Sequence, residues 1–451
     1  MTRKGLEQQV DQIIEQYVGP TSPGASVLIG RDDEVLLAKG YGMADVEGGE
    51  PITPTTRFVL GSVTKQFAAM AVMLLERRGL VSYDAPIGRY LPEMPAAWRD
   101  RITVRQLIHH TSGVPEYLTD DWWEGAVAGK YGDHQSIVDC VAALDELEFE
   151  PGSRWRYCNS GYILLGALVE RVAGQSFASF LNDNIFNPLG MDNTYVGEDD
   201  SRRPRLATGY MFKSKEEFKP APWHFAVVGG ADGNVISDTT DLYRWSQALY
   251  TEKLAPREAL GLATVPCRPH DPTFSRYGFG LMIGERRGVR VVSHGGGTLG
   301  YVTHLANFTD ERLTIVVLTN AAGCKVTRIA GELANLMLAD KMAPLVRVAL
   351  PDEHLAEKVG LYIGKPRDSE MKMTVTLPSD GDELRLAIDF GGMMPPVEHD
   401  LLPLGRDLFC AEPETDSYVH FLRDGGRVIG LRLTSLGSVL NLDRGGDVPD
   451  G

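Results

Sequence analysis

The sequence has few cysteines and no long apolar run, and these two scarcities exclude several classes of protein. Its five cysteines are odd in number and scattered, with no Cys-x-x-Cys pair. Such a set provides neither a disulfide framework nor a structural zinc site. A membrane-spanning helix needs about 20 apolar residues, and the longest candidate, Phe67 to Leu75, has about half of that. We therefore expect no membrane span.

Basic residues are also in deficit. Lys and Arg total 45 against 61 Asp and Glu, which gives a net charge of −16. A surface with this charge repels phosphate backbones and anionic lipids, and no basic run compensates. The sequence therefore excludes nucleic acid as a partner.

The N-terminus lacks the pattern of a signal peptide. Residues 1–18 contain neither a continuous apolar stretch nor a small-residue cleavage site. Apolar residues recur there at helical spacing, which predicts an amphipathic helix lying on a core. The expected location is the cytoplasm, or the periplasm or exterior if a leader has been removed.

Strand-like runs stand at both ends of a helical middle region. They are expected at residues 25–30, 34–40, 277–283, 289–293, 302–308 and 313–319, followed by a helix at 326–341. Late strands that pair with an N-terminal hairpin give an α/β sandwich, an antiparallel sheet flanked by helices, beside an all-helical region.

The length of the chain, 451 residues, predicts two domains. Pro344 and Pro351 mark a linker at 344–351, so the first domain spans 1–343 and the second 352–451. Short alternating runs separated by turn residues predict a small β-barrel in the second domain. These runs lie at 373–377, 384–388, 417–422, 428–433 and 439–442.

The run Gly61-Ser62-Val63-Thr64-Lys65 opens a segment that is apolar on nearly all sides. A helix of this kind is buried. Ser62 is thus expected at the N-terminus of a central helix, where negative charge is stabilised, with Lys65 on the same face. A desolvated lysine in this place can take the serine proton.

Ser-x-x-Lys is a weak pattern when it stands alone. About one copy is expected by chance in a chain of this length, and a second copy, Ser369 to Lys372, is expected on a solvated loop. A capping serine and a snorkelling lysine would give the same pattern at Ser62.

Two further motifs provide possible partners for the serine. Tyr157-Cys158-Asn159 precedes a predicted helix at 162–173, where Tyr157 can exchange a proton and Asn159 can hold Lys65 or a substrate amide. His294 to Gly297 follows a predicted strand, and its glycines allow close approach of a ligand. A backbone N–H there could form an oxyanion hole with that of Ser62. Each motif alone also fits a structural role.

Taken in order, Ser-x-x-Lys, Tyr-x-Asn and His-x-Gly resemble the signature of the penicillin-recognising serine hydrolases. The resemblance covers most of residues 24–338, including the runs at 79–84, 107–113, 187–191 and 229–233. It is to the branch that holds class C β-lactamases, D-alanyl-D-alanine carboxypeptidases, D-aminopeptidases and esterases. It implies a β-lactamase-like fold and no metal or cofactor.

The resemblance also implies roles for the first two motifs. Ser62 is the nucleophile, Lys65 the base for acylation, and Tyr157 the acid/base partner. Asn159 positions the substrate or Lys65. The histidines of the 107–113 run, His109 and His110, look structural in this group.

The third motif carries a departure from the β-lactamases. His294 stands where they have a lysine, which leaves less fixed positive charge for a substrate carboxylate. This is similar to D-aminopeptidases and esterases. Gly296 matches the glycine of the motif, and the backbone N–H groups of Ser62 and Gly297 are implied to form the oxyanion hole.

The C-terminal region resembles the lipocalin-like barrel appended to some D-aminopeptidase relatives. Gly391 to Pro396 is a candidate for a loop that narrows the cleft, or an ordinary connection. Trp122 and Trp123 either line the cleft or pack in the core. The sequence leaves the oligomeric state open, and a homo-oligomer is compatible with it.

The expected function is hydrolysis of a small amide or short peptide that contains a D-amino acid, through an acyl-Ser62 intermediate. A carboxylesterase or a weak β-lactamase on the same residues is the close alternative. A penicillin-binding protein with little turnover is another. A small-ligand carrier built on the barrel ranks below these, because residues 373–445 offer few large apolar side chains.

Overall fold

The computed structural model of the chain describes residues 2–127, 130, 134–197, 206–221, 230–268, 270–271, 273–367, 369–378, 383–389 and 396–446. The chain divides into two compact units. Unit 1 comprises Met1–Cys267, Tyr277–Ile283 and Arg290–Met337, and unit 2 comprises Arg268–Arg276, Gly284–Val289 and Leu338–Gly451. Nearly all of the candidate loop at 391–396 lies outside the described residues.

A six-stranded sheet has the order β10-β11-β12-β13-β1-β2. Its strands are β1 (Ala25–Arg31), β2 (Glu34–Tyr41), β10 (Met282–Arg286), β11 (Val289–Thr298), β12 (Tyr301–Phe308) and β13 (Leu313–Thr319). β1 pairs antiparallel with β13 along its whole length, from Ala25 opposite Thr319 to Arg31 opposite Leu313. The N-terminal hairpin therefore joins the late strands, as predicted.

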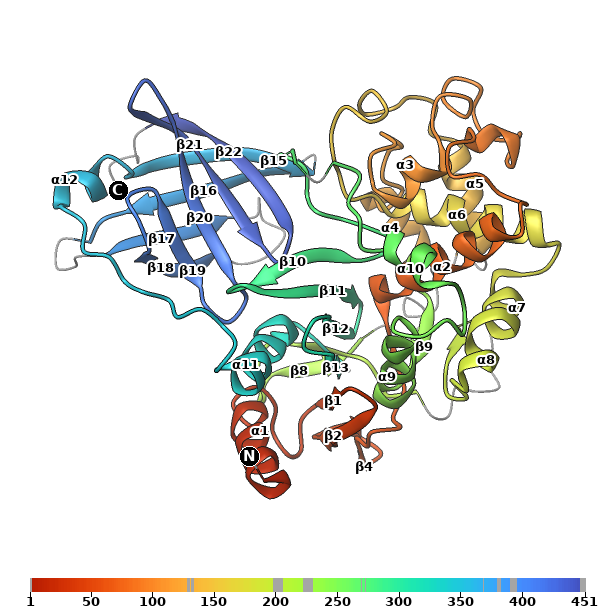
Figure 1. The fold of residues 1–451 in the computed structure, drawn as a ribbon, viewed down its shortest axis with the longest axis horizontal. Helices are drawn as coiled ribbons and strands as arrows, with labels where there is room; N and C mark the ends of the chain where they lie inside the picture. Colours follow the sequence, from red (N-terminus) through yellow and green to blue (C-terminus); the bar gives the residue numbers. More distant parts are fainter. Residues whose placement is uncertain are drawn as a thin grey trace. The chain divides into compact units, whose positions relative to one another are not determined.

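Helices cover both faces of this sheet. The helices of this part of the chain are α1 (Arg3–Ile14), α2 (Thr64–Arg77), α3 (Val104–Ile108), α4 (Asp120–Val127), α5 (His134–Ala142), α6 (Asn159–Ala173), α7 (Phe177–Leu181), α8 (Asn187–Leu189), α9 (Thr239–Ala248), α10 (Arg257–Leu262) and α11 (Val326–Leu338). Gly30 of β1 lies against Tyr243 of α9, and its neighbour Arg31 reaches Met337 of α11. Successive strand residues point to opposite faces, so α9 and α11 lie on opposite sides of the sheet (Figure 1).

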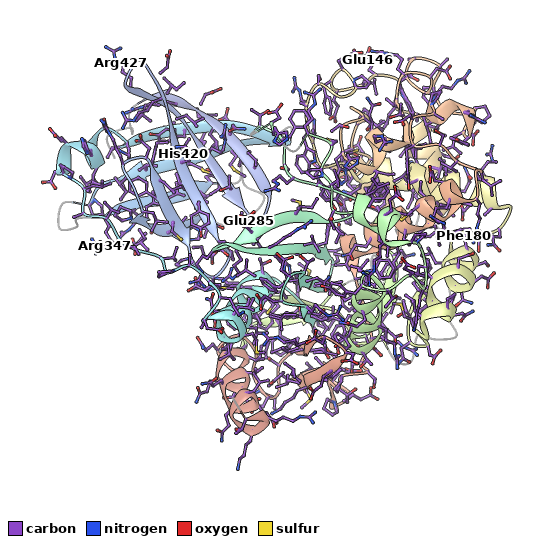
Figure 2. All side chains as sticks on the ribbon, in the orientation of Figure 1. Glu146, Phe180, Glu285, Arg347, His420 and Arg427 are labelled. Carbon is purple, nitrogen blue, oxygen red and sulfur yellow. The ribbon has the colours of Figure 1, made fainter. Side chains whose placement is uncertain are left out.

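The helical middle is built around α2. Every residue of α2 from Thr64 to Leu75 is buried, as its all-round apolar pattern predicts. Phe67 of α2 packs on Trp245 with ring centroids 4.5 Å apart, and Phe180 of α7 (Figure 2) belongs to the same core. α2 also packs against α6. No helix among the described residues has the length and apolar character required to cross a membrane.

Short strands connect these elements. They are β3 (Met43–Asp45), β4 (Glu50–Pro51), β5 (Phe58–Val59), β6 (Tyr195–Val196), β7 (Tyr210–Phe212), β8 (Phe218–Pro220), β9 (Val235–Ser237) and β14 (Ala321–Ala322).

The strand predicted at 277–283 is wrong for its first five residues. β10 begins only at Met282, because residues 278–281 form a turn in which the N–H of Gly278 donates to the carbonyl of Leu281 at 2.8 Å. Gly280 has φ +70° and lies so close to α2 that a Cβ there would come within 2.5 Å of the backbone of Lys65. β11, in contrast, continues through the glycines to Thr298, beyond its predicted end at 293.

The C-terminal part of the chain forms a closed eight-stranded barrel, drawn in blue in Figure 1, as predicted. Its strands are β15 (Gly360–Arg367), β16 (Ser369–Thr376), β17 (Leu384–Asp389), β18 (Val397–Pro403), β19 (Leu408–Glu412), β20 (Ser417–Asp424), β21 (Arg427–Ser435) and β22 (Ser438–Gly446). Side chains such as Met373, Leu386 and Phe421 fill its interior as one cluster. A filled interior argues against the small-ligand carrier.

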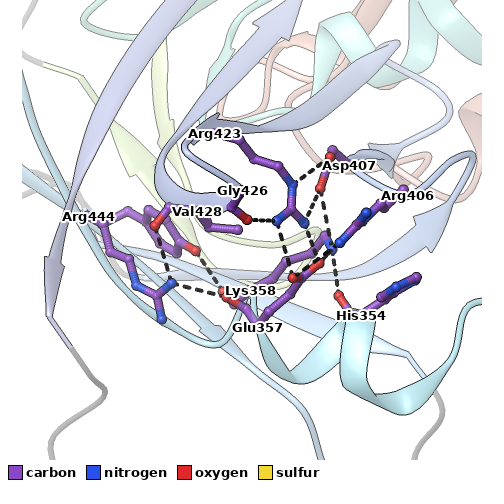
Figure 3. A network of polar contacts seen from close by, with 10 residues as sticks. His354, Glu357, Lys358, Arg406, Asp407, Arg423, Gly426, Val428 and Arg444 are labelled. Carbon is purple, nitrogen blue, oxygen red and sulfur yellow. Dashed lines mark hydrogen bonds and ion pairs between the residues drawn. The ribbon is translucent and has the colours of Figure 1, made fainter.

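An ion cluster fixes the short helix α12 (Asp352–Ala356) and the residues after it to the barrel (Figure 3). The buried ammonium of Lys358 lies 3.1 Å from Glu357 and 3.5 Å from Asp407. Arg423 binds both of these carboxylates, and its hydrogen bond lowers the pKa of Glu357 to about 2. The cluster holds the start of the barrel against β20 and the turn before β19.

Candidate active site

Ser62 and Lys65 lie together at the start of the central helix. Ser62 belongs to a 3-10 turn, Gly61–Val63, that continues directly into α2. Lys65 Nζ is 3.2 Å from Ser62 Oγ, and the lysine side chain is fully buried. The structure therefore brings together the pair that the first motif predicts.

Two oxygens besides that of Ser62 hold the lysine. Lys65 Nζ donates to Asn159 Oδ1 at 2.7 Å and to the carbonyl of Asp232 at 2.8 Å. The ring of Tyr157 lies beneath it, with 5.0 Å from Nζ to the ring centroid. The second motif, Tyr157 and Asn159, thus meets the first at Lys65.

Glu116 orients Asn159, a role that no motif in the sequence predicts. One oxygen of Glu116 accepts from the backbone N–H of Asn159 at 2.9 Å and from its side-chain Nδ2 at 3.0 Å. The first contact caps α6, and the second turns the amide oxygen of Asn159 toward Lys65. No spacing connects Glu116 with the motif, because it comes from a separate loop.

Asp232 is a second residue whose role the sequence did not indicate. Its carbonyl accepts from Lys65, while its carboxylate accepts from Tyr117 Oη at 2.9 Å and from the N–H of Gly230 at 3.1 Å. The run at 229–233 was recognised only as part of the resemblance, and Gly229 lies outside the described residues.

His110 packs directly on Tyr157, with ring centroids 4.3 Å apart. Its Nδ1 accepts from the N–H of Cys158 at 3.1 Å, so the imidazole is held between the backbone and the tyrosine ring. Burial places its pKa well below the ordinary value. The structural role expected for His110 is therefore carried out inside the site, against Tyr157.

The imidazole of His294 has both of its nitrogens engaged by the protein. Nδ1 lies 2.6 Å from the carbonyl of Gly295, and Nε2 lies 2.9 Å from the hydroxyl of Tyr277. This pattern fits a neutral ring that donates from Nδ1 and accepts at Nε2. Burial, with the charge of Lys65 nearby, lowers the pKa of His294 to about 3, so the ring carries no charge near neutral pH.

Tyr277 is the third residue that sequence reasoning missed. It is fully buried, donates to His294, and accepts on its carbonyl from Nδ1 of His109 at 2.9 Å. Its ring lies 4.5 Å from that of His110. The only sequence signal is the alternation Tyr-Gly-Phe-Gly at 277–280, which we interpreted as a strand.

The glycines of the third motif lie against the segment that leads to Ser62. A Cβ on Gly296 would come within 1.8 Å of the carbonyl oxygen of Leu60. A Cβ on Gly297 would have no described atom within 4 Å. A Cβ on Gly61 would come within 2.7 Å of the nitrogen of Gly297. The backbone of Gly297 is therefore next to that of Gly61 and Ser62.

Trp122 packs in the core, one of the two roles considered for the tryptophan pair. It is 4% exposed and meets the ring of Tyr117 edge-to-face at 5.1 Å. Trp123 is partly buried and packs against the same core.

We expected the second Ser-x-x-Lys on a solvated loop. This prediction is wrong, because the motif lies on strand β16. Lys372 forms an ion pair with Glu370 at 3.2 Å, and its side chain is 47% exposed. Residues three apart share a face on a helix but not on a strand. The two positions of this copy therefore fall on opposite faces of β16, where they cannot form the pair that Ser62 and Lys65 form.

The buried histidines predict a loss of stability in acid. Burial lowers the pKa of His109 to about 4 and that of His294 to about 3, and it places the pKa of His110 well below the ordinary value. Below pH 6.5 the unfolded chain therefore binds protons that the folded chain does not. The contribution of these histidines to the free energy of unfolding is fully present above pH 6.5. As the pH falls below 6.5, it decreases by about 1.4 kcal/mol per pH unit for each proton.

His134 has the opposite effect on the pH dependence of stability. Burial lowers its pKa, but its hydrogen bond to Glu170 and the charge of that carboxylate act against burial, and the pKa is raised. We expect Tm to fall from about pH 7.5 to about pH 5 with a net slope set by these groups. Calorimetry on the whole chain and on His294→Asn measures it, and the variant should show the shallower slope. Equal slopes would contradict a neutral, buried His294.

The comparisons with known proteins agree with the geometry. The family described as Beta-lactamase matches residues 10–335. A penicillin-binding protein of Bacillus subtilis (strain 168) is 32% identical over 314 residues, which cover 65% of this chain and 67% of that protein. The D-aminopeptidase of Gluconobacter oxydans (strain 621H) is 30% identical over 318 residues, 70% of this chain. That match spans only 58% of the D-aminopeptidase.

Two solved structures share the fold. The penicillin-binding protein homologue from Pyrococcus abyssi, described as octameric, has a TM-score of 0.66 at 24% identity, and 99% of each chain is covered. The D-amino acid amidase from Ochrobactrum anthropi SV3 has a TM-score of 0.60 at 24% identity, with 70% of this chain and 92% of that chain covered. The family match, the relatives at about 30% identity and the meeting of the three motifs around Ser62 and Lys65 lead to one conclusion: the chain belongs to the β-lactamase family of serine hydrolases.

Proposed function

We propose that the chain hydrolyses small amides and short peptides whose first residue is a D-amino acid with a free amino group. The observation that carries the proposal is the charge of the site, with the carboxylate of Glu116 next to Asn159 and a neutral imidazole at His294. A D-aminopeptidase among the relatives and a D-amino acid amidase among the similar folds support the D configuration.

Acylation starts from the contacts of Lys65. To act as the base, Lys65 must first give up one proton, and the amine that results has two N–H donors and one lone pair. The two shorter contacts, to Asn159 Oδ1 and the carbonyl of Asp232, take the donors and leave the lone pair toward Ser62 Oγ at 3.2 Å. Lys65 then takes the serine proton as Oγ bonds to the carbonyl carbon of the substrate.

The carbonyl oxygen becomes an oxyanion in this step. The N–H of Ser62, in the first turn of a helix, has no partner within the helix, and the backbone of Gly297 lies beside it. In the proposed mechanism these two donors stabilise the oxyanion.

Breakdown of the tetrahedral intermediate needs a proton on the leaving amine. Tyr157 gives its hydroxyl proton to the amine nitrogen as the C–N bond breaks, and it regains a proton from Lys65, whose Nζ lies over its ring. The amine leaves with the acyl group on Ser62. Water then attacks the ester carbon and loses a proton to Lys65. As the bond from this carbon to Ser62 Oγ breaks, Oγ takes up that proton and the carboxylic acid product leaves.

The charges near Asn159 favour an amine over a carboxylate in the substrate. A carboxylate has about four acceptor positions. Among the described residues, Glu116 accepts three hydrogen bonds, from the N–H of Leu118 and the two nitrogens of Asn159, which leaves one position for a substrate ammonium. His294, being neutral, offers no fixed positive charge to a carboxylate.

The first test compares D-alanyl and L-alanyl p-nitroanilides with p-nitrophenyl acetate, with Ser62→Ala as the blank. We expect Ser62-dependent cleavage of the D-anilide that exceeds that of the L-anilide by at least about tenfold. Fast ester cleavage with both anilides inert would make the chain a carboxylesterase. Stoichiometric labelling by a β-lactam without turnover of any substrate would make it a penicillin-binding protein.

Glu116→Gln tests the amine site separately. We expect kcat/KM for D-alanyl p-nitroanilide to fall by about 10-fold to 100-fold, because a hydrogen bond between charged groups is lost. Gln keeps one oxygen for the N–H groups of Asn159, so p-nitrophenyl acetate should lose only a few-fold. Equal losses on both substrates would show that Glu116 acts on Asn159 alone.

A further inference from the structure

Residues 277–283 form a short segment, here called the strap, that touches two parts of the active site. At one end Tyr277 donates to Nε2 of His294 at 2.9 Å. In the middle, Gly280 lies directly on α2, where a Cβ would come within 2.5 Å of both the nitrogen of Gln66 and the carbonyl carbon of Lys65. A displacement of the strap would therefore disturb His294 and the helix turn that carries Lys65.

Both flanks of the strap belong to unit 2, whereas the strap itself belongs to unit 1. On the first flank, the N–H of Arg276 donates to the carbonyl of Gly437 at 2.8 Å. Ser275 Oγ accepts from the N–H of Val439 at 3.0 Å. These bonds hold the residue just before Tyr277 against the turn between β21 and β22.

The second flank is held by a buried ion pair. Arg286 is 1% exposed and lies 2.7 Å from Asp416, which is also 1% exposed. Arg286 donates as well to the carbonyls of Glu414 at 3.0 Å and Pro413 at 3.2 Å. Its neighbour on β10, Glu285 (Figure 2), is exposed.

Asp416 has further support from Tyr418, whose hydroxyl donates to it at 2.9 Å. Separating the two partners of a buried ion pair leaves a buried charge uncompensated, which costs free energy. The pair therefore holds Arg286 and Asp416 firmly in place. Gly284, at the start of the flank, lies so close to Leu436 that a Cβ would come within 2.7 Å of its backbone. Both flanks of the strap are thus fixed within unit 2 by hydrogen bonds, by the ion pair and by close packing.

We propose that unit 2 is a positioning element of the active site, and that Arg286 and Asp416 act through Tyr277. The strap has only seven residues between its two fixed flanks, so a shift of either flank is transmitted along the covalent chain to Tyr277. Misplacement by about 1 Å can cost about 10²-fold in rate. The proposal rests on acyl transfer at Ser62 and is independent of the substrate class.

The test uses the whole chain and p-nitrophenyl acetate, with separate kcat and KM. Asp416→Asn should lower kcat by about tenfold with KM within about twofold, because binding of this small ester does not involve the strap. Arg286→Lys keeps the positive charge opposite Asp416, so this variant should keep most of the activity of the unchanged chain. The double exchange Arg286→Met with Asp416→Leu leaves no charge buried, so it should fold and still lose kcat.

Tyr277→Phe separates positioning from general damage to the fold. If Asp416 acts through Tyr277, adding Asp416→Asn to Tyr277→Phe should cost much less than it does in the unchanged chain. Glu285→Gln on the same strand, and Arg423→Gln in the ion cluster of Figure 3, are matched controls that should keep kcat within about twofold.

Full kcat in both Asp416→Asn and the double exchange would overturn the proposal, and so would full additivity with Tyr277→Phe. Ester turnover that survives Ser62→Ala would overturn the acyl-Ser62 mechanism and this inference with it. Inert D-anilides together with the expected ester results would overturn only the proposed substrate class.

Discussion

Lys65→Met is expected to lower kcat/KM by about 10³-fold to 10⁴-fold on every substrate of the chain. The exchange removes the base that takes the proton of Ser62, and the hydroxyl at 3.2 Å then has no acceptor of comparable strength. It also leaves Asn159 Oδ1 and the carbonyl of Asp232 without their donor. Steady-state kinetics, with a thermal scan to show that the variant is folded, measures the effect.

The chain carries its own control for this experiment. Lys372→Met alters the other Ser-x-x-Lys, whose lysine is half-exposed on β16 and paired with Glu370. It should leave kcat/KM unchanged and Tm within about 2 °C, because an exposed ion pair contributes about 0–1 kcal/mol. Similar kinetics for both variants would refute the assignment of Lys65 as the base.

Gly296→Ala is expected to lower kcat by about 10²-fold to 10³-fold. A Cβ at this position would come within 1.8 Å of the carbonyl oxygen of Leu60 and 2.5 Å of Thr303 Oγ1. Thr303 itself donates to the same Leu60 oxygen at 2.7 Å, so neither group can give way without loss of that bond. β11 must move away from the segment before Ser62, and the N–H of Gly297 leaves the oxyanion position.

Gly295→Ala provides the matched control one residue away. A Cβ there would have its nearest neighbours, atoms of His304 and Thr303, at 3.7 Å, an ordinary van der Waals distance. Activity should stay within about threefold of the unchanged chain. A large loss in Gly295→Ala, or none in Gly296→Ala, would show that the fit of β11 against Leu60 does not set the site.

Elements with strong local patterns could be predicted from the sequence. The buried helix α2, the hairpin of β1 and β2, the amphipathic helices and the existence of a barrel all follow from apolar spacing, which depends on neighbouring residues. β13 was predicted with both of its ends. The strands β15, β18 and β19 were not anticipated, because their sequences, GLYIGKPR, VEHDLLP and LFCAE, show no regular apolar alternation. Pairing with their neighbours in the closed barrel makes them strands.

The sequence by itself determined the fold class and the three motifs, because each motif lies within a few residues of chain and carries its chemistry in its side-chain types. The tertiary structure decided which residues support them. Glu116, Asp232 and Tyr277 reach the site from loops far apart in the chain, where no spacing rule applies. It also decided the charge of His294, since burial is a property of the surroundings, and it separated the two Ser-x-x-Lys motifs by folding one as a helix and the other as a strand.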